Sequence, residues 1–156
     1  MTDADVDFDA FDHESHMRRA LDLARAAMDR GDRPFGSVLV RDDAVVMEAS
    51  NRVVTEDDVR RHPELDLATR ARRELSSEER AETVMYTSTE PCPMCAGGIR
   101  HADLGRVAYS VSGCDVGEFT DQGAPVQSAA ILAGVTEVVG PVLNEEGREI
   151  HAAYDW

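Results

Sequence analysis

The sequence predicts an α/β protein of three layers, α/β/α, in which helices cover both faces of a central mixed sheet of about five strands. Segments with helical periodicity alternate with short β-rich runs, a pattern typical of helices packed on a sheet. Two of the early β-rich runs are separated by a short polar turn, which indicates a hairpin. The 156 residues are enough for a single domain with its own core.

The first elements are predicted from periodicity and stop signals. Apolar residues recur at helical spacing over roughly residues 16–30, and Gly31 follows as a helix stop. Two strands are expected at 35–40 and 45–49, joined by the polar turn at 41–43. These two strands form the predicted hairpin.

A long irregular segment, residues 51–61, is expected to be a loop that carries His62 to the start of the next helix. Pro63 suits the first helical position, where no backbone N–H is needed, and the helix should continue to about Leu75. The Gly-rich stretch 112–124 is expected to be a substrate loop. The remaining predicted elements are strands at 83–87, 106–111 and 137–139 and helices at 92–100, 125–133 and 145–154.

Composition limits the partners and the location of the protein. The formal net charge is −15, from 31 acidic and 16 basic residues, so nucleic acid is a disfavoured partner unless the acidity is an adaptation to high salt. The acidic segment 1–12 lacks the apolar run of a secretory signal, and residues 13–156 are interpreted as one domain. No window suits a membrane span. Three cysteines, two of them closely spaced, suit a reducing compartment and indicate a cytoplasmic protein.

Two short motifs carry the chemistry. His62, Pro63 and Glu64 form H-x-E, and Cys92 and Cys95 lie in P-C-x-x-C at a predicted helix start. Together they match the signature of zinc deaminases. One imidazole and two thiolates make three ligands for one Zn²⁺ per chain, and the fourth position stays open to water or hydroxide, as at catalytic zinc sites.

Glu64 lies two residues beyond His62 and is expected to be the catalytic proton carrier. Zinc lowers the pKa of bound water towards neutrality, and the resulting hydroxide would attack the amino-bearing carbon of a ring. Glu64 would move protons between that water, the ring nitrogen and the leaving amine. Release of ammonia would complete a hydrolytic deamination.

Other interpretations of the two motifs stay open. Cys92 and Cys95 alone would suit a structural zinc half-site or a redox pair, and H-x-E occurs by chance in many proteins. A zinc-stabilised binding module without activity would need a closed site with a fourth protein ligand. The available fourth ligands are Cys114, His13, His16, His101 and His151.

The chain resembles the cytidine deaminase superfamily, and within it the branch of guanine deaminases, small cytosine deaminases and tRNA adenosine deaminases. The likeness rests on the two motifs, on P-F-G-S-V at 34–38, on N-R-V at 51–53 and on Y-T-S-T-E-P at 86–91. It implies a cytidine deaminase-like fold, a homodimer and a free nucleobase substrate, first guanine, which would yield xanthine. Cytosine or another aminated heterocycle, such as a triazine or isoguanine, is the alternative. A tRNA substrate comes next, disfavoured by the acidic balance and by the lack of a basic C-terminal tail.

The resemblance also implies substrate contacts. We expect Phe35 and Asn51 to contact the base, Asn51 through an amide that offers a donor and an acceptor, although it could also be a turn asparagine. Asp115 matches a substrate-facing aspartate of guanine deaminases, with an exposed surface acid as the alternative. Tyr154 and Trp156 would close the pocket, as a C-terminal segment often donated by the partner subunit does in guanine deaminases. Core packing of the last helix is the alternative.

Two residues depart from the family pattern. Pro63 replaces the usual alanine of H-A-E. A rigid residue at this position would alter how the carboxylate of the neighbouring Glu64 moves. Ser37 stands where alanine is common. Neither change removes a metal ligand.

Overall fold

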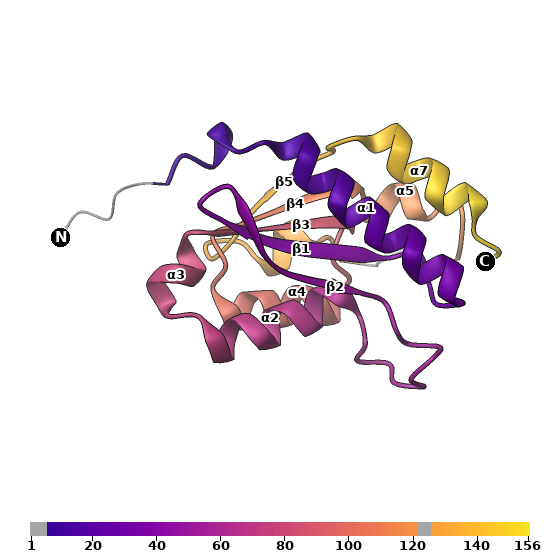
Figure 1. Ribbon diagram of the computed structural model, residues 1–156, viewed down its shortest axis with the longest axis horizontal. Coiled ribbons are helices and arrows are strands. Elements are labelled where there is room, and N and C mark those ends of the chain that lie inside the picture. The colour runs from indigo at the N-terminus through magenta and orange to yellow at the C-terminus, as the bar shows by residue number, and fades with distance from the viewer. Residues whose placement is uncertain (1–5, 122–125) are drawn as a thin grey trace.

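The computed structural model describes residues 6–121 and 126–156, and within these ranges five strands form one sheet (Figure 1). The strands are β1 (Gly36–Arg41), β2 (Ala44–Ser50), β3 (Thr83–Thr89), β4 (Arg106–Val111) and β5 (Glu137–Val139). Their order across the sheet is β2-β1-β3-β4-β5. β1 runs antiparallel to β2 and β3, whereas β3, β4 and β5 are parallel to one another. The predicted mixed sheet is confirmed.

Helices cover both faces of this sheet. α1 and α7 pack on one face, and α2 and α4 pack on the other, so the predicted α/β/α layering is also confirmed (Figure 1). The described helices are η1 (Phe8–Ala10), α1 (His13–Arg30), α2 (Pro63–Glu74), α3 (Ser77–Ala81), α4 (Pro93–Ala102), α5 (Gly113–Val116), α6 (Ser128–Ile131) and α7 (Asn144–Ala153). Among the described residues, no helix is long and apolar enough to cross a membrane.

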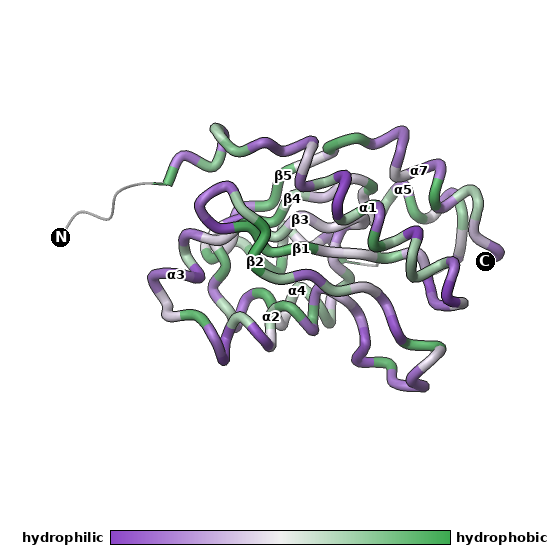
Figure 2. Tube along the Cα trace, viewed as in Figure 1, coloured by the Kyte–Doolittle hydropathy of each residue, from purple (hydrophilic) through white to green (hydrophobic). Residues whose placement is uncertain are grey.

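Each face of the sheet has its own core. In β1, Val38 and Val40 pack towards α1, whereas Leu39 between them packs with residues of α2 and α4. Successive strand side chains point to opposite faces, so a strand that is covered on both faces is apolar throughout. Figure 2 shows hydrophilic and hydrophobic residues alternating along α1, as expected for a helix with one buried side.

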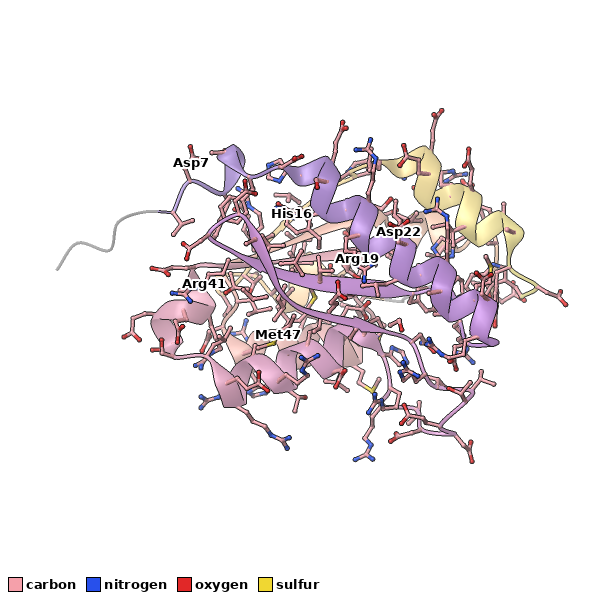
Figure 3. All side chains as sticks on the ribbon, in the orientation of Figure 1. Asp7, His16, Arg19, Asp22, Arg41 and Met47 are labelled. Atoms are coloured by element: carbon pink, nitrogen blue, oxygen red, sulfur yellow. The ribbon has the colours of Figure 1, made fainter. Side chains whose placement is uncertain are left out.

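The first helix begins earlier than predicted, at His13. The Asp12 side chain stabilises this earlier start, because it accepts a hydrogen bond from the Ser15 backbone N–H in the first turn. At the other end Gly31 adopts a left-handed conformation with φ of 96°, which confirms the predicted stop. Arg19, labelled in Figure 3, joins α1 to β2 through an ion pair with Glu48 at 2.7 Å.

The segments after β3 and β4 differ most from the prediction. Within the stretch 112–124, which was expected to be irregular, Ser112 caps the short helix α5. The helix expected at 125–133 is wrong in length, because among the described residues of that range only α6 is helical before the chain turns towards β5. Residues 122–125 lie outside the described residues. The short helix α3 was not predicted, although Ser76 opens it with a capping box that an S-x-x-E pattern could have revealed.

The acidic N-terminal segment is described from residue 6 onwards, and residues 1–5 lie outside the described residues. Asp9 accepts a hydrogen bond from Arg106 at 3.0 Å, and the Phe8 ring lies 5.3 Å from the same guanidinium. These contacts attach the described part of the segment to β4. The division into a segment 1–12 and a domain 13–156 stays a prediction.

Candidate active site

The two sequence motifs lie at the N-termini of α2 and α4. His62 is the N-cap of α2 and Cys92 is the N-cap of α4. A proline follows each of them at the first helical position, Pro63 and Pro93. Proline restricts the preceding residue to an extended conformation, and His62 and Cys92 have ψ angles of 138° and 167°. Local sequence therefore sets where each helix begins and leaves a metal-binding side chain at its tip.

Three metal-binding side chains converge at these helix starts. The ligand atoms of His62, Cys92 and Cys95 all lie within 4.8 Å of one another. Cys92 Sγ is 3.7 Å from His62 Nδ1. One imidazole and two thiols form a donor set that suits Zn²⁺. In the described part of the chain no further such residue joins the cluster, so a closed structural site with a fourth protein ligand gains no support.

Hydrogen bonding shifts the pKa values of the two thiols in opposite directions. The pKa of Cys92 falls to about 4, first because Cys95 hydrogen-bonds to it and then because His62 does. The same hydrogen bond, together with burial, raises the pKa of Cys95. The Cys92 sulfur in turn raises the pKa of His62. A divalent cation held between both sulfurs would favour their ionised forms, so the cluster suits a metal electrostatically as well.

Glu64 lies in the first turn of α2 beside this cluster and is 5% exposed. Burial raises the pKa of its carboxyl group. Thr87 Oγ1 donates to Glu64 Oε1 at 2.8 Å, and Ser37 Oγ lies 3.2 Å from the same oxygen. Ser37 Oγ also lies 2.8 Å from Thr87 Oγ1 and donates to it, so a chain of two hydroxyl groups from β1 and β3 leads to the carboxylate and orients it. A buried carboxyl with a raised pKa suits a group that accepts and returns protons.

A cavity of about 120 Å³ opens in front of the cluster. His62, Cys92 and Glu64 line it, and so do Phe35 and Trp156, whose ring centroids lie 6.1 Å apart; these two rings are called its aromatic side. The other lining residues are Arg33, Thr89, Glu90, Gly113, Val116 and Thr120. Several residues predicted from the sequence therefore meet at one cavity, and its aromatic side suits a planar ring.

Two predicted substrate contacts, Asp115 and Tyr154, do not line the cavity. Asp115 Oδ2 lies 3.4 Å from Asn144 Nδ2 and 3.5 Å from an Arg148 guanidinium nitrogen, so its carboxylate faces α7. Tyr154 packs edge-on against Trp156, with ring centroids 4.8 Å apart. Asp115 would have to leave its partners on α7 to reach a substrate, whereas Tyr154 supports a residue that lines the cavity.

Asn51 is fully buried and also lies outside the cavity lining. Its Oδ1 accepts the Val53 backbone N–H at 3.0 Å, the contact expected of a turn asparagine. Its Nδ2 is buried and has no hydrogen-bond partner within the described ranges. The side-chain oxygen therefore stabilises the turn, whereas the side-chain N–H groups have no acceptor among the described residues.

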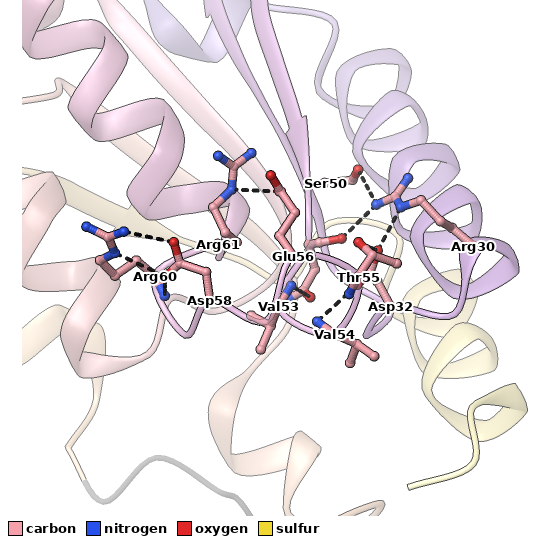
Figure 4. Close-up of polar contacts among 11 residues, drawn as sticks. Arg30, Asp32, Ser50, Val53, Val54, Thr55, Glu56, Asp58, Arg60 and Arg61 are labelled. Carbon is pink, nitrogen blue, oxygen red and sulfur yellow. Dashed lines mark hydrogen bonds and ion pairs between the residues drawn. The ribbon is translucent and has the colours of Figure 1, made fainter.

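An ion pair between Arg30 and the buried Asp32 holds the loop that follows Asn51 (Figure 4). Asp32 accepts a hydrogen bond from Arg30 Nε at 2.7 Å, and its other oxygen accepts the backbone N–H groups of Val54 and Thr55. Arg30 also donates to the backbone oxygen of Asn51 at 2.7 Å. The predicted loop is thus held at its start by residues that lie far from it in sequence, which local patterns could not show.

Sequence reasoning missed several polar residues that line the cavity, among them Thr89 and Glu90. Glu90 accepts the Gly113 N–H at 2.9 Å and both the N–H and the hydroxyl of Ser128, so it ties two later segments to the cavity. Thr89 Oγ1 lies 2.8 Å from His151 Nε2. Their position directly before P-C-x-x-C is the one sequence signal that could have drawn attention to them.

Comparison with known proteins identifies the family. The sequence model of the MafB19-like deaminase family matches residues 11–138, which are most of the chain. The chain belongs to this deaminase family. Its predicted place in the cytidine deaminase-like superfamily is confirmed, and its relatives are hydrolytic deaminases. Enzymes of this superfamily are generally zinc-dependent, in agreement with the His/Cys/Cys cluster.

The deaminase is similar to enzymes with different substrates. It is 36% identical to the guanine deaminase of Bacillus subtilis over 107 residues, which are 68% of this chain and 69% of that protein. It is 32% identical to a probable cytosine deaminase of Schizosaccharomyces pombe over 152 residues, or 90% of each chain. A solved structure from work on tRNA:A34 deaminases matches it with a TM-score of 0.70 at 29% identity, over 87% of this chain and 98% of that one. The reaction type is therefore shared, whereas the substrate differs among relatives.

Proposed function

We propose that the deaminase removes the amino group of a free nucleobase, guanine first, to give xanthine and ammonia. The observation that carries this proposal is one cavity lined by Glu64, by two residues of the metal-binding cluster, His62 and Cys92, and by the aromatic residues Phe35 and Trp156. Aromatic side chains in the same cavity as a proton carrier would hold a planar ring within reach of it, with the amino-bearing carbon of the ring towards the cluster. The similarity to a guanine deaminase puts guanine first.

His62, Cys92 and Cys95 would hold one Zn²⁺ per chain through an imidazole nitrogen and two sulfurs. When bound there, zinc lowers the pKa of water to about 7 and so supplies a nucleophile at neutral pH. Glu64 accepts the proton that the attacking water loses and delivers it to a ring nitrogen. It would then take the proton of the hydroxyl group newly bonded to the ring carbon and pass it to the amino group, so that the C–N bond breaks, a C=O bond forms and ammonia leaves. Burial of Glu64 raises its pKa and favours this exchange.

The substrate contacts are proposed from the aromatic side of the cavity. Phe35 and Trp156, whose ring centroids lie 6.1 Å apart, would contact the base, and Tyr154 would support Trp156. Trp156 would then close the cavity of its own chain. Asn51 would use its unpartnered Nδ2 towards an acceptor on the base. Asp115 would bind a guanine N–H once it left its partners on α7.

Two other substrates rank below guanine. Cytosine comes second, because the probable cytosine deaminase matches 90% of the chain. The adenosine of a tRNA comes third, since a net charge of −15 opposes approach to phosphates. A homodimer, from the family resemblance, and a cytoplasmic location, from the closely spaced thiols, complete the proposal.

An ammonia-release screen tests the proposal. Zinc-loaded protein is incubated with guanine, adenine, cytosine, isoguanine, amino-triazines, nucleosides and a tRNA anticodon stem, at low and at multimolar salt. The Glu64→Gln variant is the matched control for contaminating activities. We expect guanine to show the highest kcat/KM. Faster turnover of cytosine or of the tRNA stem would overturn the substrate assignment, and bound zinc without ammonia from any compound would indicate a binding module.

A further inference from the structure

Thr89 and His151 form a buried hydrogen-bonded pair at the cavity. Thr89 ends β3 and lines the cavity, whereas His151 lies in α7. Thr89 Oγ1 is 2.8 Å from His151 Nε2. His151 is 1% exposed and Thr89 is 6% exposed. One hydroxyl in the cavity wall is thus held by a histidine from a distant part of the chain.

The surroundings of His151 decide which ring nitrogen carries the proton. Its Nδ1 is buried and has no hydrogen-bond partner in the described part of the chain. The ring stacks on Phe119 and on Trp156 with an interplanar angle of 29° in each pair, and the Phe35 ring lies against it at 56°. An N–H on Nδ1 would meet only aromatic rings among the described residues, and a contact with an aromatic face is much weaker than a hydrogen bond. A buried N–H without a partner costs more than an unused lone pair, so the proton belongs on Nε2.

This proton placement sets the direction of the hydrogen bond to Thr89. Burial, and then the charge of Arg148, lowers the pKa of His151 to about 4, so the imidazole is neutral. A neutral ring with its proton on Nε2 donates to Thr89 Oγ1. The hydroxyl then accepts on that side, and its own proton is left to be donated elsewhere. Because Thr89 lines the cavity, that proton is available to a ligand.

We propose that the His151–Thr89 pair makes Thr89 a hydrogen-bond donor to the substrate, and hence a specificity-determining residue. His151 acts through Thr89 and is a positioning residue. The inference rests on the proposed function and narrows it to bases that present a carbonyl oxygen or an unprotonated ring nitrogen to Thr89. A base that presents an N–H or an amino group there is rejected, because two donors would face each other.

The proton placement is tested by ¹⁵N NMR of the zinc-loaded protein at pH 7, with the signals of His151 assigned by their loss in His151→Phe. The nitrogen shifts distinguish a protonated ring nitrogen from an unprotonated one. We expect Nε2 to carry the proton and Nδ1 to carry none. A proton on Nδ1 would reverse the hydrogen bond to Thr89 and overturn the inference.

The role of the hydroxyl is tested by kinetics with the best substrate of the ammonia screen. Thr89→Val removes the hydroxyl at nearly constant shape, and we expect KM to rise about tenfold with a smaller change in kcat. Thr89→Ser should restore most of the loss. Thr136→Val is the matched control, since Thr136 is also 6% exposed and its hydroxyl donates to Leu104 O. An unchanged KM in Thr89→Val, or equal losses in Thr89→Val and Thr89→Ser, would overturn the inference.

Failure of the proposed function has a different signature. If the wild-type chain releases no ammonia from any base, the proposed function fails, whereas the NMR result still decides the proton placement. Calorimetric binding of guanine is measured in the inactive Glu64→Gln variant with and without Thr89→Val, and binding of the product xanthine in the wild type and in Thr89→Val, so neither measurement needs turnover. We expect binding to the variant to be about tenfold weaker. Equal affinities would overturn the inference even in an active enzyme.

Discussion

The two sides of the cavity are built in different ways. The metal-binding side comes from two helix starts, with His62 and Glu64 on α2 and Cys92 on α4, each helix opened by a proline. The aromatic side combines Phe35, just before β1, with Trp156, the last residue of the sequence. Rules that act within a few residues place the first side, whereas packing of the whole chain assembles the second. We infer that local sequence sets the reaction and remote segments set the substrate.

The relatives agree with this division. Proteins named for guanine, cytosine and tRNA substrates share the deaminase reaction with this chain. A fold that keeps one reacting centre and varies the walls around it can serve several substrates. Variants should therefore separate the two sides, with losses of metal or of kcat on one side and changes in KM on the other.

Breaking the metal-binding side should have the largest effect. Cys92→Ala removes one of the three donor groups of the cluster, so we expect loss of bound zinc and no measurable ammonia release. Plasma mass spectrometry and the ammonia assay measure the two quantities. Cys114→Ser is the control, because Cys114 is exposed and outside the cluster. Loss of zinc in the control would show that the ligand set is wrong.

Removing the proton carrier should leave the metal in place. We expect Glu64→Gln to lower kcat by about 10²- to 10⁴-fold, the usual contribution of general acid–base catalysis, with an unchanged zinc content. The amide keeps the shape of the side chain and can still accept the Thr87 hydroxyl. A kcat within about threefold of wild type would mean that another group moves the proton.

On the substrate side, His151 should make stability depend on pH. Its pKa falls from 6.5 in the unfolded chain to about 4 in the fold, so between these values the unfolded chain binds more protons. His151 therefore makes its full contribution to the free energy of unfolding above pH 6.5. That contribution, about 3 kcal/mol in total, is lost as the pH falls towards 4. Urea unfolding of the wild type and of His151→Phe across this range measures it. Parallel pH curves for the two proteins would contradict the prediction.

Removing the aromatic cap should change binding more than folding. Trp156 is 37% exposed but stacks on His151, so Trp156→Ala should lower the unfolding temperature by a few degrees without unfolding the protein. We expect KM for guanine to rise about tenfold, since one aromatic contact with the ring is lost. Tyr154→Ala should act in the same direction but more weakly, because Tyr154 reaches the cavity only through Trp156. A loss confined to kcat would place Trp156 on the reacting side instead.

The smallest effect should come from Ser37, where the sequence departs from the family pattern. Ser37 Oγ lies 3.2 Å from Glu64 Oε1, and the Thr87 hydroxyl contacts the same oxygen at 2.8 Å. Ser37→Ala should lower kcat by less than about tenfold, because one hydrogen bond to the carboxylate remains. Thr87→Val should cost more. The reverse order would show that Ser37 is the main support of Glu64.

Elements with local signals were predicted closely. The strands at 106–111 and 137–139 have the expected bounds, and α2 begins at Pro63 as its position in the sequence indicated. Elements that depend on their surroundings were predicted less well. The helix expected at 125–133 shortens to α6, whose start is held by Glu90 from a distant part of the chain. A periodic pattern shows that a helix can form, but not where tertiary contacts end it.

The sequence by itself determined where His62, Glu64, Cys92 and Cys95 would lie, at two helix starts, because proline and motif spacing act over a few residues. Only the tertiary structure decided which side chains meet across the aromatic side. The pairing of Thr89 with His151, 62 residues apart, depends on how α7 packs on the sheet. Such partners are chosen by packing over the whole chain, which no short pattern encodes.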